Sequence, residues 1–306
     1  MSFFHNIKTE NISLDFSYLN QDLRFYMKRE DLIHPIISGN KFRKLKYNLK
    51  EFKKNKNSIL ITFGGAFSNH LLAVAYLGKV ERIETLAIVR GEELKNSKLN
   101  STLKKCSDFG MNFDFISREN YRKRNTNEYI LELKNKHKNS YIVPEGGTNI
   151  FGIKGCEEIL TEHDKEFFDV VCVPVGSGGT FSGLVNSSLS NQKILGFSAL
   201  NNSNINEVIN RFVKKNNWKI FDDSCFGGYA KFNNELINFI NKFYKNHNIK
   251  LDPIYNAKMI FNIIDLINKN KWRFGKNILI INTGGTQSSI GINELLKKKG
   301  CETINY

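Results

Sequence analysis

Short apolar runs rich in Val, Ile and Leu recur along this 306-residue chain. Each run is continuous rather than alternating, which is typical of parallel strands that are covered on both faces. Between the runs, apolar residues recur every three or four positions, as at 42–54 and 257–268, which predicts helices. This alternation predicts an α/β fold with open, twisted, mostly parallel sheets and helices on both faces. The runs lie at 58–63, 85–90, 169–175, 194–198 and 277–282.

The charge of the chain is strongly basic, but it does not point to a nucleic-acid partner. Lys and Arg number 45 against 30 Asp and Glu, which gives a formal charge of +15. The excess is mostly Lys spread over helical stretches, without zinc-finger spacing or an aromatic RNA-binding motif, and we interpret it as solvated surface. No apolar run approaches the ~20 residues that a membrane helix needs, and the first residues lack a signal-peptide pattern.

Cysteine and histidine spacing disfavours a disulfide framework and a metal site. The five Cys are scattered and form no C-x-x-C pair, so we expect reduced thiols and a cytoplasmic protein. The six His include no H-x-x-x-H pair or other metal spacing. We interpret His163, next to Asp164, as part of a surface turn.

Four glycine-rich segments carry the candidate chemistry. Three of them directly follow a predicted strand and precede a helix, and all four contain Ser, Thr or Asn. Ligands of open α/β sheets bind at the carboxyl ends of strands, so four such corners predict one shared small-molecule site. The alternative is that these glycines only permit the turns between strands and helices and form no ligand site. The segments are 63–70 (FGGAFSNH), 145–149 (EGGTN), 176–180 (GSGGT) and 282–286 (NTGGT).

The segment 176–180 is the best candidate for a phosphate site. Glycine lets backbone N–H groups approach an anion, and the N-terminus of the following helix adds a favourable partial charge. The last glycine of a dinucleotide fingerprint would fall on Phe181, and no Gly-Lys-Ser/Thr sequence follows. A single phosphate group is therefore favoured over a nucleotide.

A further motif places a lysine at the start of a predicted helix. Ser38-Gly39-Asn40 is typical of a helix start, with Ser38 or Asn40 as the cap and Lys41 in the first turn. The helix dipole disfavours a cation there, which would lower the pKa of a nucleophilic amine. Taken alone, Lys41 is one of very many lysines, and a solvated position is its default interpretation.

Together these segments resemble the 1-aminocyclopropane-1-carboxylate deaminase / D-cysteine desulfhydrase family, which are pyridoxal-phosphate enzymes of fold type II (tryptophan-synthase-β-like). The resemblance runs in the same order from about residue 24 to about residue 291, and its lysine motif is the most specific part. The matching segments are 28–31 (KRED), 38–45 (SGNKFRKL), 64–70, 145–148, 176–180, 252–259 (DPIYNAKM) and 283–285 (TGG).

The resemblance implies a role for each matched residue. Lys41 would bond covalently with pyridoxal 5′-phosphate and later remove the α-proton of the substrate. Ser68 would face the substrate and bind its carboxylate or relay a proton, and Tyr229 and Tyr255 would be the active-site tyrosines. The implied cofactor-binding residues are Lys41, Asn69, Gly176, Ser177, Gly178, Gly179, Thr180 and Thr283, and the implied substrate-binding residues are Ser68, Asn69, His70, Tyr229 and Tyr255.

Two residues depart from the deaminase pattern. Asn256 stands where the deaminase has a Glu that contacts the pyridine nitrogen, and Thr283 would make that contact instead, as in related dehydratases and racemases. This implies a neutral ring, which is a weaker electron sink, whereas cyclopropane opening needs a strong one. His70 replaces the Gln of the deaminases and matches the desulfhydrases and racemases. Both departures favour α,β-elimination over ring opening.

We therefore expect a lyase that converts D-cysteine, or a related β-substituted amino acid, to pyruvate, ammonia and hydrogen sulfide. The alternatives are 1-aminocyclopropane-1-carboxylate deaminase, serine racemase or dehydratase and, outside the enzymes, a non-catalytic phosphate-ligand or nucleic-acid binder. The resemblance also implies a homodimer and two α/β domains with the cofactor between them. Residues 45–151 would form a smaller domain inserted into a larger one made of 1–44 and 152–306.

Overall fold

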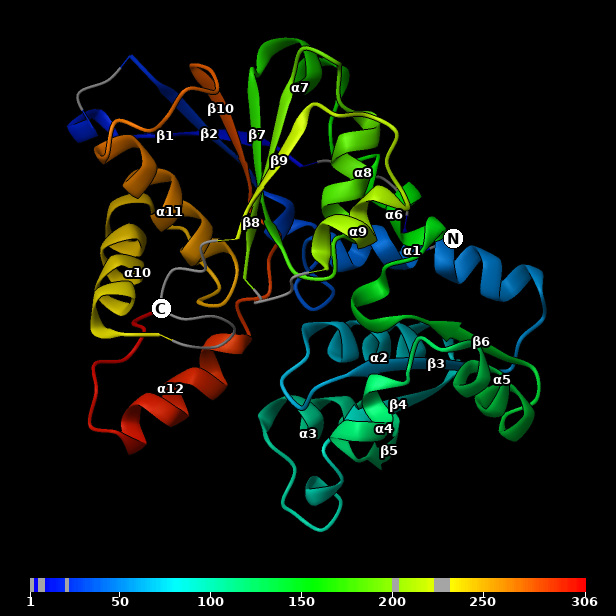
Figure 1. Cartoon of the computed structure of the whole chain (residues 1–306). Helices are drawn as coiled ribbons and strands as arrows, with labels where there is room; N and C mark the ends of the chain where they lie inside the picture. The colour runs from blue at the N-terminus through cyan, green and yellow to red at the C-terminus, as the bar shows by residue number, and fades with distance from the viewer. Residues whose placement is uncertain (1–2, 5–8, 20–21, 200–203, 223–231) are drawn as a thin grey trace.

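The computed structural model describes residues 3–4, 9–19, 22–199, 204–222 and 232–306. Within them, two separate sheets carry helices on their faces, and the predicted α/β class with mostly parallel strands is confirmed (Figure 1). The strands are β1 (Asn11–Leu14), β2 (Arg24–Lys28), β3 (Ile59–Gly64), β4 (Glu84–Arg90), β5 (Asn112–Ile116), β6 (Ser140–Val143), β7 (Val170–Val175), β8 (Lys193–Ser198), β9 (Trp218–Phe221) and β10 (Asn277–Ile281).

The helices include short and long elements on both sides of the sheets. They are α1 (Asn40–Lys54), α2 (Asn69–Glu81), α3 (Ser101–Asp108), α4 (Arg118–Arg122), α5 (Asn127–Lys136), α6 (Ile150–Cys156), α7 (Glu162–Phe167), α8 (Gly179–Ser187), α9 (Ile205–Asn210), α10 (Asn234–His247), α11 (Asn256–Asn268) and α12 (Ser288–Lys298). Among the described residues, none of these helices combines the length and the apolar character needed to cross a membrane.

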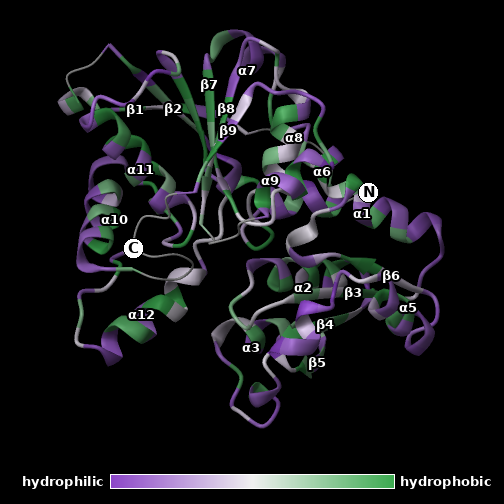
Figure 2. Ribbon diagram, in the orientation of Figure 1, coloured by the Kyte–Doolittle hydropathy of each residue, from purple (hydrophilic) through white to green (hydrophobic). Residues whose placement is uncertain are grey.

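The larger sheet has six strands in the order β1-β2-β10-β7-β8-β9. β1 is antiparallel to β2, and the remaining neighbours are parallel. Along β7, Val170 and Cys172 face a core formed with α10 and α11, whereas Val171 and Val173 face a core formed with α8. This burial on both faces explains why the runs of β7, β8 and β10 are continuously apolar, as Figure 2 shows for β7 and β8.

The smaller sheet has four parallel strands in the order β5-β4-β3-β6. Helices α1, α2 and α3 cover one face, and residues of α4 and α5 cover the other. The apolar stripe predicted on the helix from residue 42 packs into this core with Phe42, Leu45, Leu49 and Phe52. All four strands come from residues 59–143, and the predicted domain edges near residues 44–45 and 151–152 stay predictions.

The helix α1 does not begin as the sequence predicts. Its N-cap is Gly39, which makes no side-chain cap, so the prediction of Ser38 or Asn40 as the cap is wrong. Gly39 has a φ of +62°, and a Cβ there would lie 1.8 Å from the carbonyl oxygen of Thr283. Ser38 and Asn40 use their side chains for contacts with the glycine-rich corners instead. The turn before Lys41 is thereby pressed against the end of β10.

Candidate active site

The four glycine-rich corners lie at the carboxyl ends of β3, β6, β7 and β10. Residues from all four, together with the first turn of α1, line one cleft of about 950 Å³. The corners therefore converge as the sequence predicts for a shared site. Of the predicted site residues, the cleft is lined by Lys41, Ser68, Asn69, His70, Gly176, Ser177, Gly178, Thr180, Tyr255 and Thr283. Gly179 lies directly behind the loop at the start of α8, and Tyr229 lies outside the described residues.

Lys41 projects from the first turn of α1 into the cleft. Its Nζ donates to Oδ1 of Asn40 at 3.0 Å, and the Asn40 amide nitrogen donates to the hydroxyl of Thr180 at 2.8 Å. Burial, followed by the positive charge of Lys44, lowers the pKa of Lys41 to about 7. A large fraction of this amine is therefore unprotonated near neutral pH, as a nucleophile requires.

Lys44 is a second cation of the site, which the sequence analysis missed. Its side chain is buried, and its Nζ donates to the carbonyl of Gly146 at 2.9 Å and lies 3.4 Å from the hydroxyl of Thr148. Burial lowers the pKa of Lys44. Among the described residues no carboxylate forms an ion pair with Lys41 or Lys44. The cleft thus holds two basic side chains without an ion-pair partner among the described residues, and a bound anion can compensate the charge that they carry.

The loop after β7, for which the sequence predicts a phosphate site, lies against Lys44 and the corner after β6. A Cβ on Gly179 would lie 3.0 Å from Nζ of Lys44 and 2.7 Å from the Thr148 hydroxyl, so glycine is needed for this close approach. The hydroxyls of Thr148 and Ser177 lie 2.7 Å apart and join the corner after β6 to the corner after β7. The N-terminus of α8 and the side chain of Lys44 thus lie at the same end of the cleft.

The corner after β3 begins α2, and Ser68 caps that helix by accepting from the N–H groups of His70 and Leu71. Asn69 donates to the carbonyl of Gly285 at 3.4 Å, while its Oδ1 is buried without a hydrogen-bond partner among the described residues. An unpartnered buried oxygen at a cleft is expected where a ligand supplies the partner.

His70 is buried at the base of the same corner. Its Nε2 lies 2.9 Å from the Thr62 hydroxyl, and that hydroxyl donates to the carbonyl of Val143 at 2.9 Å. Since the hydroxyl has one proton, Nε2 must carry the hydrogen of the ring. Burial, Lys41 and Lys44 hold the pKa of His70 well below its ordinary value, so the ring is neutral. Its Nδ1, which has no hydrogen-bond partner in the described part of the chain, is then an acceptor.

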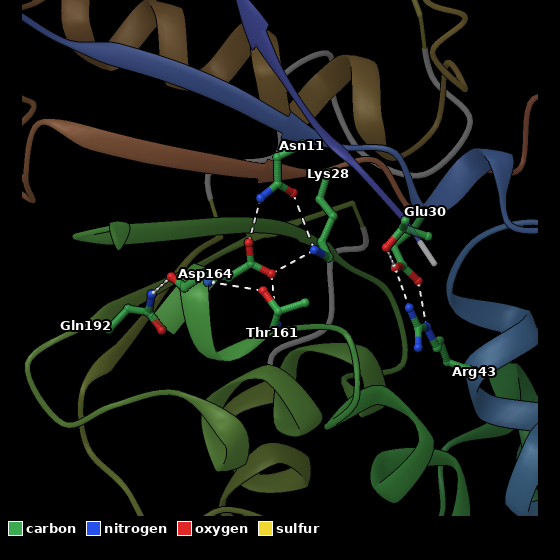
Figure 3. A network of polar contacts seen from close by, with 8 residues as sticks. Asn11, Lys28, Glu30, Arg43, Thr161, Asp164 and Gln192 are labelled. Carbon is green, nitrogen blue, oxygen red and sulfur yellow. Dashed lines mark hydrogen bonds and ion pairs between the residues drawn. The ribbon is translucent and has the colours of Figure 1, made fainter. Parts of the chain in front are cut away.

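Two buried ion pairs anchor the segment that leads to Lys41 (Figure 3). Lys28, at the end of β2, lies 2.7 Å from the carboxylate of Asp164, and both side chains are almost completely buried. Arg43 of α1 binds Glu30 through two hydrogen bonds of 2.8 and 2.9 Å. The motif 28–31 therefore fixes the position of the lysine helix on the larger sheet.

Asp164 corrects one interpretation of the sequence. The pair His163–Asp164 does not form a surface turn, because Asp164 is completely buried in the first turn of α7. It completes a capping box with Thr161 and accepts from Lys28 and Asn11. The sequence offered a signal for this, since Thr161 and Asp164 have capping-box spacing.

The sequence analysis missed Lys44 and the contact of Asn40 with Lys41 and Thr180. Lys44 lies three residues after Lys41 and so on the same side of α1, which is a weak signal in a chain with so many lysines. Asn40 was considered only as a helix cap. Its contacts with Thr180 join residues that are 140 positions apart, which no local pattern reveals.

Comparison with known proteins agrees with this geometry. A family model described as "Pyridoxal-phosphate dependent enzyme" matches residues 5–284. A Pyrococcus abyssi protein provisionally named 1-aminocyclopropane-1-carboxylate deaminase is 31% identical, over 85% of this chain and 84% of its own length. A bifunctional D-cysteine desulfhydrase/1-aminocyclopropane-1-carboxylate deaminase of Arabidopsis thaliana is 28% identical, over 85% of this chain and 72% of its own.

Solved structures extend the similarity to the whole fold. The crystal structure of a homologue of 1-aminocyclopropane-1-carboxylate deaminase superposes with a TM-score of 0.79 at 25% sequence identity. The match covers 95% of this chain and 93% of the homologue, so it includes both sheets and the cleft between their glycine-rich corners.

Proposed function

Because this chain belongs to the pyridoxal-phosphate dependent enzymes of the 1-aminocyclopropane-1-carboxylate deaminase/D-cysteine desulfhydrase family, we propose that it catalyses α,β-elimination from D-cysteine. The reaction consumes D-cysteine and water and releases pyruvate, ammonia and hydrogen sulfide. The observation that carries this proposal is Lys41, an amine with a pKa of about 7 in a cleft beside a glycine-rich anion site.

The described residues fit pyridoxal phosphate in three respects. Lys41 offers a nucleophilic amine to an aldehyde. Ser177 and Thr180 belong to the loop after β7, and Lys44 lies beside it. These three residues would hold a phosphate. The buried Oδ1 of Asn69, which has no partner among the described residues, would accept from the ring hydroxyl in the role that the resemblance implies.

When bound, the cofactor supplies an aldehyde that captures amines and a ring that withdraws electrons from the α-carbon. The substrate amine would release Lys41, whose neutral Nζ would then take the proton from the α-carbon. Ser68 would bind the substrate carboxylate by donating its hydroxyl proton, because its oxygen already accepts from His70 and Leu71, and the partial positive charge at the N-terminus of α2 favours an anion there. Tyr255 lines the same cleft and would contact the substrate from the larger sheet.

The experiment that tests this proposal begins with the cofactor. Purified protein is mixed with pyridoxal phosphate, reduced with borohydride and digested, and the modified peptide is identified by mass. Modification of Lys41 and release of pyruvate from D-cysteine support the proposal. Modification that is scattered over exposed lysines, such as Lys50, contradicts it.

The second candidate is deamination of 1-aminocyclopropane-1-carboxylate, and the names of the relatives above favour it. His70 favours elimination, because it replaces the residue that the deaminase motif has at this position. The products separate the two reactions, since ring opening gives 2-oxobutyrate and elimination from cysteine gives pyruvate. If the enzyme is given each amino acid in turn and releases only 2-oxobutyrate, D-cysteine is not its substrate.

Two further predictions concern the setting of the enzyme. We propose a reducing, cytoplasmic location, which the free thiols of Cys106, Cys156 and Cys172 in the core support. We also propose the homodimer that the resemblance implies, and sedimentation analysis of the purified protein tests it.

A further inference from the structure

A buried polar network lies behind the cleft at the end of β10. Thr283 lines the cleft, whereas Asn256 at the start of α11 and Asp252 before it are completely buried. The hydrogen bonds among these three residues have no role in the reaction as described above. They determine whether the Thr283 hydroxyl donates to a ligand or accepts from it.

The hydrogen-bond partners of Asn256 fix the orientation of its amide. The amide nitrogen lies 2.5 Å from Oδ2 of Asp252 and 3.1 Å from the carbonyl oxygen of Gly284, which are both acceptors. The amide oxygen accepts from the backbone N–H of Thr283 at 3.1 Å. A flipped amide would place oxygen against two acceptors, so chemistry allows only this orientation. Both N–H groups of Asn256 are used within the protein.

The hydroxyl of Thr283 points its proton toward this amide. It donates to Oδ1 of Asn256 at 3.3 Å. A hydroxyl carries one proton and two lone pairs. With its proton directed away from the cleft, Thr283 presents lone pairs to a ligand and therefore acts as an acceptor.

Asp252 is the acceptor at the end of this network and so sets the direction of its hydrogen bonds. Its carboxylate accepts from the backbone N–H groups of Ile254, Tyr255 and Asn256 at 2.8–3.0 Å, in addition to the Asn256 amide. Burial raises the pKa of Asp252, and these four bonds oppose that effect. Both oxygens face N–H donors, which favours the ionised form. The other titratable groups that interact with it electrostatically are Lys41 and Tyr306.

We propose that Asp252 and Asn256 are positioning residues that hold the Thr283 hydroxyl as an acceptor, so that this end of the site binds the protonated pyridine nitrogen of the cofactor. The carboxylate acts through the amide on the hydroxyl, and the chain thus retains an acidic group two hydrogen bonds behind the contact. This inference rests on the proposed function and differs from the neutral ring expected from the sequence. A charged ring serves elimination and ring opening alike, so product analysis still decides between these reactions.

The test is the ¹⁵N chemical shift of pyridoxal phosphate labelled at the ring nitrogen and bound to the protein. In the wild type we expect the shift of a pyridinium at neutral pH. Thr283→Val and Asn256→Ala should move the signal toward that of unprotonated pyridine, and Thr283→Ser should restore the wild-type position. Asn262→Ala is the matched control, because this amide of α11 binds the carbonyl of Lys258, outside the residues that line the cleft.

Two results would overturn the inference and are distinct from failure of the proposed function. An unprotonated ring in the wild type contradicts it, and so does a pyridinium signal that persists in both Asn256→Ala and Thr283→Val. If no yellow complex forms and borohydride does not trap Lys41, the proposed function fails, and this inference fails with it. If Asn256→Ala does not fold, Thr283→Val alone decides, because it removes one hydroxyl and leaves Asp252 with all its partners.

Discussion

Two neighbouring pairs of basic side chains have opposite kinds of partner in this chain. Lys28 and Arg43 each have a carboxylate within 2.8 Å, and both partners are buried. Lys41 and Lys44, on the same helix as Arg43, have only neutral oxygen partners in the contacts described above. A buried cation without a counter-charge is costly, and it persists where a ligand provides that charge. The ion pairs of Lys28 and Arg43 therefore stabilise the fold, whereas Lys44 can compensate a bound anion and Lys41, with its lowered pKa, can act as a nucleophilic amine.

The largest effect that we expect is that of Lys41→Ala on turnover. Loss of the amine removes both the covalent link and the base, so the rate of pyruvate release should fall by at least about 10³-fold. Lys50→Ala, an exposed position on the same helix, should leave the rate unchanged. A rate for Lys41→Ala near that of the wild type would show that Lys41 is neither the covalent link to the cofactor nor the base.

The next effect concerns stability, measured as the urea midpoint of the cofactor-free protein. Lys28→Met leaves Asp164 buried and uncompensated, and it should lower the free energy of unfolding by about 3–5 kcal/mol. The double variant Lys28→Met/Asp164→Asn removes both charges, keeps an oxygen for the N–H groups of Thr161 and Asn11, and should recover part of this loss. A small loss in the single variant would contradict a structural role for the pair.

In contrast to Lys28→Met, Lys44→Met should weaken cofactor binding and leave stability almost unchanged. Because Lys44 has no carboxylate to leave behind, unfolding of the cofactor-free protein should change by less than about 1 kcal/mol. The dissociation constant for pyridoxal phosphate should instead rise about 10- to 100-fold, from the loss of a charge-assisted bond to phosphate. Titration of the absorbance of the bound cofactor measures this constant. An unchanged constant would remove Lys44 from the anion site.

The smallest effect is on the pH dependence of cofactor capture. With the pKa of Lys41 at about 7, the neutral fraction of the amine rises about fivefold between pH 6 and pH 7 and changes little above pH 8. The rate of formation of the yellow complex should follow this curve. A rate that keeps increasing toward the ordinary lysine pKa would mean that Lys41 is solvated.

The same pKa has a consequence for stability without cofactor. Between about pH 7 and the ordinary value of 10.5, the unfolded chain binds a proton at Lys41 that the folded chain does not. Stability therefore rises with pH in this window, and below pH 7 this contribution is constant. Lys41→Met should flatten the rise, which urea midpoints at pH 7 and pH 9 would measure.

Sequence reasoning predicts best what local pattern determines. The strands β7, β8 and β10 are continuously apolar because both their faces are buried, and this is visible along the chain. β2 (RFYMK) was not predicted, because it is short and begins and ends with basic residues. The lysine motif and the glycine corners were visible because glycine is required where backbone segments come close.

Contacts between distant segments account for what the sequence did not reveal. Asp164 looks like a surface residue until β2 brings Lys28 beside it, 136 positions away. Ser38 fits a helix cap by type, but its hydroxyl accepts from Gly285 across 247 positions. Burial is the leading cause of the lowered pKa of Lys41, and the contribution of Lys44 was not predicted from the sequence.

The turn at Gly39 has a consequence for the timing of biosynthesis. This turn is pressed against Thr283 and held through Ser38 and Gly285, so the reactive lysine is locked in place by residues near the other end of the chain. At translation rates of about 5–20 residues per second, those residues are made more than about ten seconds after Lys41. A ribosome-bound chain thus carries Lys41 before the segment that contacts its turn has been made, and we expect Lys41 to reach its final position only after residues 283–285 have been synthesised.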